Sequence, residues 1–147
     1  MSNERPRRRT LHNILLVLGG LALLAILSCG GLFYWGMGQM RDVEAAADAF
    51  MGELAGGRTD EAYQRTDAAF QAHASREAFS EMIAKYPLVT KHTSLRKGAR
   101  RVQATPQGPT AFIEYLLGGP DGFLPVRVTL VRNETWKVVG LNLPELP

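Results

Sequence analysis

Two neighbouring stretches decide the fold of this chain: Thr-Ala-Phe-Ile-Glu-Tyr-Leu-Leu at residues 110–117 and Phe-Leu-Pro-Val-Arg-Val-Thr-Leu-Val-Arg at residues 123–132. The first is rich in residues that favour strands, and the second places Val126, Val128 and Leu130 on one face of a strand. The glycine-rich cluster between them is typical of a tight turn. Together the two stretches predict an antiparallel β-hairpin with one apolar face.

One further strand is expected on each side of this hairpin. Residues 95–105 form a highly charged strand that leads into a Pro-Gln-Gly-Pro turn at residues 106–109. After the hairpin, residues 135–141 form the last strand, with Trp136 and Val138 on one face. These segments predict a curved antiparallel sheet of three to four strands.

Helical periodicity precedes the strands. Val43, Ala47, Phe50 and Leu54 recur at the spacing of one helix face, and the glycine pair at 56–57 supplies a stop.

Three shorter helices are expected before the first strand. Thr59 and Ser75 favour the N-cap position of two of them, and a third begins after Thr66 or Asp67. Pro87 ends the last of these helices. Helices followed by consecutive strands predict an α+β fold, in which the helices pack on one face of the sheet.

An apolar stretch of 22 residues without a charge, from Ile14 to Trp35, precedes the predicted domain. At a rise of about 1.5 Å per residue, a helix here is long enough to cross about 30 Å of hydrocarbon. Arginines before such a helix remain in the cytoplasm, and aromatic rings at its end lie at the outer interface. The residues that indicate this topology are Arg5, Arg7, Arg8, Arg9, Tyr34 and Trp35.

We therefore predict a single-pass membrane protein with its N-terminus in the cytoplasm and its C-terminal domain in the periplasm or outside the cell. The expected segments are a basic tail at 1–13, a transmembrane helix at 14–36, a linker at 37–41, an extracytoplasmic domain at 42–143 and a short tail at 144–147.

Two alternatives for the N-terminus stay open. The apolar stretch is longer than a usual signal peptide core, which argues against cleavage. Ile-Leu-Ser-Cys at 26–29 loosely resembles a lipoprotein signal, in which Cys29 would carry the lipid. Small glycine residues within the stretch allow close helix approach, so a homodimer through the membrane helix is a further option.

The charge of the chain reflects its topology. From Arg41 onward there are 13 basic and 13 acidic residues, so the net charge of +3 comes from the N-terminal tail. A nucleic acid partner is therefore not expected, because such binding needs a basic face on the folded domain. A local run of basic residues predicts either a solvated strand face or a patch for anionic lipids or an acidic partner: Lys91, Arg96, Lys97, Arg100 and Arg101.

The segments Gly57–Tyr63 and Glu134–Leu141, together with the order of helices and strands, resemble the nuclear transport factor 2-like superfamily, whose fold is cystatin-like α+β. The chain also resembles membrane-anchored bacterial proteins of unknown function that carry such a domain behind one helix. The resemblance implies a bent sheet wrapped around helices, with a pocket between them. Members include ketosteroid isomerases, dehydratases and proteins without known chemistry.

An isomerase-like site needs a carboxylate base and an acidic donor in an apolar pocket. Glu114 and Asp67 are the candidate bases, and Tyr115 is a candidate donor. Alternation along the strand leaves two options for Glu114. It faces the pocket together with Phe112 and Leu116, or it faces solvent while its odd-numbered neighbours are buried.

The remaining motifs point away from metal and cofactor chemistry. No His, Cys or carboxylate cluster has zinc spacing, no glycine-rich phosphate loop follows a strand, and no serine lies in a nucleophile elbow. We expect no metal site and no cofactor. The favoured hypothesis is a membrane-anchored, non-catalytic domain that binds a partner protein, a lipid or a small apolar ligand. The alternative is an isomerase or dehydratase with a carboxylate base.

Overall fold

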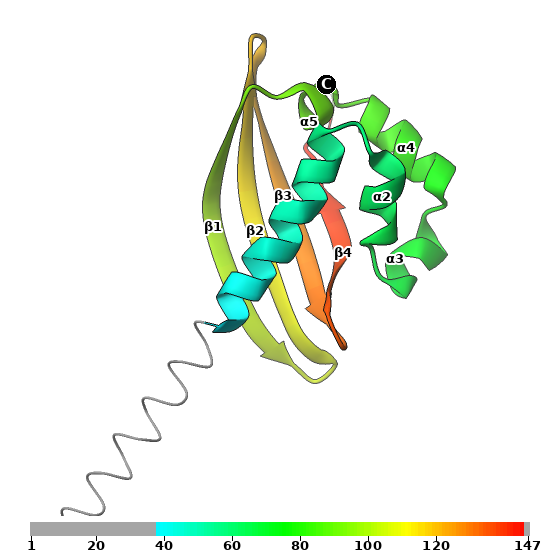
Figure 1. Cartoon of the computed structure of the whole chain (residues 1–147), viewed down its shortest axis with the longest axis vertical. Helices are drawn as coiled ribbons and strands as arrows, with labels where there is room; N and C mark the ends of the chain where they lie inside the picture. The colour runs from blue at the N-terminus through cyan, green and yellow to red at the C-terminus, as the bar shows by residue number, and fades with distance from the viewer. Residues whose placement is uncertain (1–37, 146–147) are drawn as a thin grey trace, which may run out of the picture. The chain divides into compact units, whose positions relative to one another are not determined.

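Four strands build one antiparallel sheet in the computed structural model, which describes residues 38–145 (Figure 1). They are β1 (Ser94–Thr105), β2 (Gly108–Gly119), β3 (Gly122–Arg132) and β4 (Trp136–Asn142), and they lie in this order in the sheet. Two-residue turns join β1 to β2 and β2 to β3. Gly122 enters β3 with φ 130°, a conformation that glycine adopts without strain.

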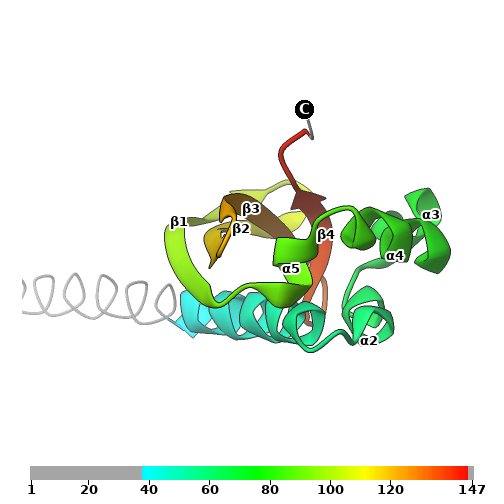
Figure 2. The same ribbon diagram turned by 90° about the horizontal axis from the view of Figure 1, so that it is seen from above.

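Five helices of the described chain accompany the sheet. A long helix occupies residues 38–55, followed by α2 (Thr59–Gln64), α3 (Ala68–His73), α4 (Arg76–Ala84) and α5 (Pro87–Lys91). The long helix and α5 lie on one side of the sheet, and α2, α3 and α4 lie beyond β4 (Figure 2). The prediction of an α+β fold with helices packed on an antiparallel sheet is confirmed.

The predicted tail, membrane helix and Cys29 lie outside the described residues. Within residues 38–145, no helix is both long enough and apolar enough to cross a bilayer.

Alternation along the strands defines the core. Odd-numbered residues of β2 and even-numbered residues of β3 are buried against the helices. The predicted apolar face of the long helix meets them, because Val43, Ala47, Phe50 and Leu54 are each fully buried. The strand residues of this core are Ala111, Ile113, Tyr115, Leu117, Val126, Val128, Leu130, Trp136 and Val138.

Side-chain caps begin two of the short helices as predicted. The Asp67 carboxylate accepts a hydrogen bond from the Phe70 backbone N–H at 2.8 Å, and the Ser75 hydroxyl accepts one from the Ala78 N–H at 3.1 Å.

Two local predictions were wrong. Arg58, not Thr59, holds the N-cap position of α2, and its side chain makes no capping bond. Three short helices were predicted before the first strand, but a fourth, α5, follows α4. Pro87 lies in its first turn, where the missing N–H has no helical acceptor in any case.

The free edge of β4 is covered by the chain between α2 and α3. The Asp67 N–H donates to the Val138 carbonyl at 2.9 Å, and the Val138 N–H donates to the Arg65 carbonyl at 3.0 Å. Thr66 thereby forms a parallel bridge to Val138. This pairing satisfies backbone groups that an edge strand otherwise exposes.

Ion pairs fasten β1 to the long helix. The Arg100 Nη1 atom lies 2.6 Å from a Glu44 oxygen, and the Lys97 ammonium contacts the Asp48 carboxylate. The Tyr115 hydroxyl donates to the other Asp48 oxygen at 2.9 Å. Glu44 meets Arg100 and Asp48 meets Lys97, so residue numbers rise along the helix as they fall along β1. The long helix therefore runs antiparallel to β1.

Burial raises the pKa of Tyr115, and the hydrogen bond to Asp48 and the negative charges of Asp48 and Glu44 raise it further. The phenol therefore stays protonated in the folded domain at pH values where an exposed tyrosine ionises.

We predict that Phe79→Ala lowers the free energy of unfolding by about 3–5 kcal/mol. Phe79 is 1% exposed, and its ring lies 5.7 Å from that of Tyr63 and 5.8 Å from that of Phe70 between centroids. Urea denaturation of a chain that starts at residue 38, followed by circular dichroism, measures the loss. The matched control is Phe123→Ala, because Phe123 is 70% exposed and its loss costs about 0.5 kcal/mol or less. Equal losses in the two variants would contradict the core assignment.

We predict that the stability of the domain falls above about pH 10 and that Tyr115→Phe weakens this fall. Above that pH the unfolded chain releases the phenolic proton while the folded domain retains it, so the free energy of unfolding decreases by up to about 1.4 kcal/mol per pH unit. Urea midpoints at about pH 9 and about pH 11 measure the effect. The same pH dependence in both proteins would show that Tyr115 is not the group responsible.

Candidate binding surface on the open face of the sheet

The side of the sheet opposite the helices, here called the open face, carries the even-numbered residues of β2 and the odd-numbered residues of β3. Strand register places Glu114 opposite Arg127 and Leu116 opposite Pro125 on this face. Apart from Gly118, these residues are half-buried or exposed, whereas the central residues of the other face, 111–117 in β2 and 126–130 in β3, are buried. The alternation that builds the core therefore also leaves a mixed polar and apolar surface accessible.

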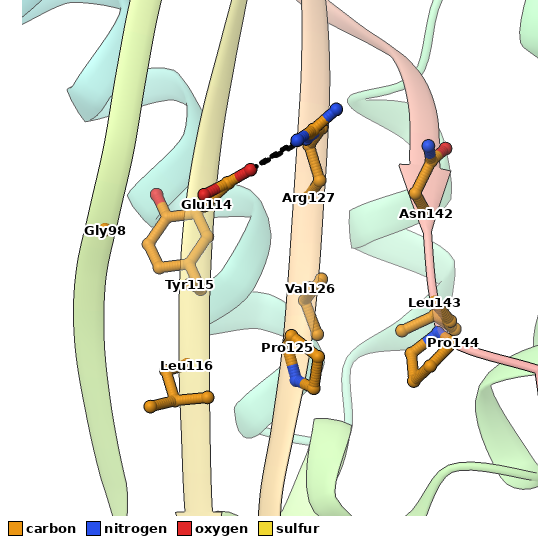
Figure 3. A pocket seen from close by; sticks show the side chains of 10 residues that line it. All are labelled: Gly98, Glu114, Tyr115, Leu116, Pro125, Val126, Arg127, Asn142, Leu143 and Pro144. Carbon is orange, nitrogen blue, oxygen red and sulfur yellow. Dashed lines mark hydrogen bonds and ion pairs between the residues drawn. The ribbon is translucent and has the colours of Figure 1, made fainter.

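A hollow of about 420 Å³ lies in the middle of the open face (Figure 3). Leu116, Pro125 and the segment Leu143–Pro144 line one end, and Glu114, Arg127 and Asn142 lie at the other end (Figure 3). Ligand sites have volumes of about 300–1,000 Å³ and are mostly apolar with a few polar groups. The hollow has the size and composition of a small-molecule site.

A second hollow of about 200 Å³ adjoins the first on the side of the β1–β2 turn, and both are lined by Arg127 and Asn142. Its lining is mainly polar and comes from all four strands: Arg101, Gln103, Thr110, Ala111, Phe112, Arg127, Thr129 and Asn142. The open face is thus apolar toward the β2–β3 turn and polar toward the β1–β2 turn.

Arg127 lies between the two hollows and is held from two sides. Its Nε atom donates to a Glu114 oxygen at 3.1 Å, and its Nη2 atom contacts the same oxygen. Its guanidinium carbon also lies 4.9 Å from the centre of the Phe112 ring. Both side chains of the ion pair are more than one third exposed, so the pair contributes at most about 1 kcal/mol to stability. Its main effect is to fix the orientation of the guanidinium group.

The candidate catalytic residues lie apart. Glu114 lines the 420 Å³ hollow on the open face, where its carboxylate is paired with Arg127. Tyr115 lies on the opposite face beneath the long helix, and Asp67 caps α3. Glu114 and Tyr115 both contribute to the lining of this hollow, but the Tyr115 hydroxyl is bonded to Asp48 of the long helix, and Asp67 does not line the hollow.

The basic run is divided between two faces of β1. Lys97 and Arg100 face the long helix and its acidic residues, whereas Arg96 and Arg101 lie opposite Leu116 and Phe112 on the open face. Lys91 lies apart in the last turn of α5. The run is therefore not one continuous patch.

Sequence reasoning missed three residues of the open face: Arg127, Lys137 and Asn142. Alternation was a usable signal for Arg127, because its neighbours Val126 and Val128 were predicted to share the opposite face. Lys137 lies opposite Val131 and Asn142 opposite Arg127, so both also project from the open face. Whether Lys137 and Asn142 lie on the open face depends on the β3–β4 register, which a bulge between Thr129 and Leu130 shifts.

Residues 38–145 contain no group of three His, Cys, Asp or Glu side chains that could hold a metal ion.

Comparison of the sequence with known proteins adds no family assignment. No protein-family model matches the chain, and no curated protein matches it. The resemblance to the nuclear transport factor 2-like superfamily therefore stays a prediction that rests on the residues quoted above.

Proposed function

We propose that this protein is a single-pass membrane protein whose extracytoplasmic domain binds a partner or an apolar ligand on the open face of its sheet, without catalysing a reaction. The observation that carries this proposal is the 420 Å³ hollow, whose apolar end is formed by Leu116, Pro125 and the segment Leu143–Pro144. Concave, mostly apolar surfaces with a few polar groups at one end are the usual sites of small-molecule binding.

The membrane anchor in this proposal rests on the sequence. The apolar stretch at 14–36 ends shortly before residue 38, the first described residue of the long helix, and the arginines before the stretch favour a cytoplasmic N-terminus. A retained anchor would hold the domain, and hence the open face, close to a bilayer.

The isomerase alternative gains no support from the described geometry. A general base of that kind needs an apolar environment that raises its pKa, together with a donor nearby. Glu114 instead contacts a guanidinium group, and Asp67 accepts a backbone hydrogen bond as a cap. Each carboxylate already has a structural partner.

The proposed superfamily relationship predicts a pocket between sheet and helices. In the described domain, that side of β2 and β3 is filled by core side chains such as Tyr115, Leu117 and Val128. We therefore place the proposed binding site on the opposite face, where the strand residues are not covered by helices.

Reporter fusions test the topology. We expect alkaline phosphatase fused after Pro147 to be active and green fluorescent protein at the same position to remain dark, because the C-terminus lies outside the cytoplasm. Full-length protein should sediment with membranes. Replacing the four arginines with alanine should reduce the phosphatase signal. A fluorescent fusion in the cytosolic fraction would contradict the anchor.

Mass spectrometry tests the binding surface. The full-length protein is extracted with its own membrane and cross-linked before the measurement. We expect bound lipids or cross-linked partners to map to β2, β3 and residues 143–144, and Leu116→Asp to remove most of them by placing a charge in the hollow. Leu95→Asp is the matched control, since Leu95 is an exposed leucine of β1 outside that hollow. Thermal unfolding confirms that both variants are folded. Retention of the same bound molecules by Leu116→Asp would contradict the proposed surface.

A further inference from the structure

We infer that the ligand of the open face is an amphiphile with a single anionic head group, a carboxylate or a phosphate, and one apolar chain. This inference rests on the proposed function and assigns its ligand class. The head group would lie between Arg101 and Arg127 in the 200 Å³ hollow, and the chain would lie in the adjoining 420 Å³ hollow.

Charge is distributed differently on the two faces of the sheet. On the helix side, Lys97 and Arg100 are paired with acidic residues of the long helix. Glu114 is the one acidic residue among the described strands, and it shares the open face with four cations. These cations are Arg96, Arg101, Arg127 and Lys137. The open face therefore has an excess positive charge that an anion would balance.

Two arginines form the head-group site. Arg101 and Arg127 line the same hollow from β1 and β3, on either side of Phe112. No ion pair within residues 38–145 involves Arg101. Guanidinium groups recognise carboxylates and phosphates through paired N–H donors, and Arg127 is already oriented by Glu114 and the Phe112 ring.

Neutral donors complete this site. The hydroxyl groups of Thr110 and Thr129 and the side-chain amides of Gln103 and Asn142 line the same hollow. Hydroxyls and amides can each donate to an oxyanion. A neutral head group would leave the Arg101 guanidinium without a charged partner, so the lining favours an anion.

The two hollows share part of their lining. Arg127 and Asn142 line both, so a molecule whose head contacts them can extend directly past Pro125 toward Leu143 and Pro144 (Figure 3). A volume of about 420 Å³ fits a small molecule. Stable protein interfaces bury about 800 Å² on each partner, which the hollow alone does not supply.

Photolabelling of the full-length protein in phosphatidylcholine nanodiscs tests the inference. The probes are diazirine-bearing dodecanoic acid, the matching alkyl phosphate and the matching alcohol. We expect one or both anionic probes to label peptides that contain Leu116, Pro125 or Leu143, and the alcohol to label them about tenfold less. The stronger of the two anionic probes identifies the head group as carboxylate or phosphate.

Adjacent arginines of β1 supply the matched variants. Arg101→Ala should reduce anionic labelling about tenfold, whereas Arg100→Ala, on the helix side of the same strand, should leave it unchanged. Both side chains are exposed, so neither loss should unfold the domain. Three results would each overturn the inference. The alcohol could label as strongly as the anionic probes, Arg101→Ala could leave the labelling unaffected, or cross-links could join two open faces and exclude the probes.

The outcomes separate this inference from the proposed function. If Leu116→Asp removes native ligands or partners while Arg101→Ala does not, the binding surface stands and the anionic head group is wrong. If Leu116→Asp has no effect on native ligands or partners, the proposed function itself fails.

Discussion

The register of β2 against β3 is the constraint on which the other features of the domain depend. Because side chains alternate between faces, a slip of one residue would bring Glu114 under the helices and Tyr115 to the outside. The two-residue turn before Gly122 fixes this register, and the hydrogen bond from Tyr115 to Asp48 is possible only in it. One register therefore determines both the core and the surface that remains open for binding.

Sequence patterns predicted the elements whose signals are local. Apolar spacing identified the buried face of the long helix, glycine-rich turns located the central hairpin, and Asp67 and Ser75 identified two helix starts. The charged strand was harder to interpret. Strict alternation would place Lys97 and Arg100 on opposite faces, but a bulge between them turns both toward Glu44 and Asp48. Gly98 was the only local hint of that irregularity.

The open face could not be assembled from the sequence, because its residues come from strands distant in the chain. Arg101, Arg127 and Asn142 meet only after three strand pairings are known. The superfamily resemblance directed attention to the side between sheet and helices, which core side chains fill. Alternation left two options for Glu114. The structure selects the option in which its odd-numbered neighbours are buried, and it adds the partner Arg127, which sequence spacing did not suggest.

The edges of the sheet explain why recognition would use its face. The backbone N–H and C=O groups of Val138 in β4 are paired with the segment around Thr66, which blocks the middle of this edge. The described edge of β1 carries four cations and a bulge, two features that discourage strand pairing between chains. A ligand of this domain would then be recognised by side chains and not by added β-strand hydrogen bonds. The face carries excess positive charge beside an apolar hollow. Side-chain recognition there favours a molecule that has both a negative charge and an apolar part.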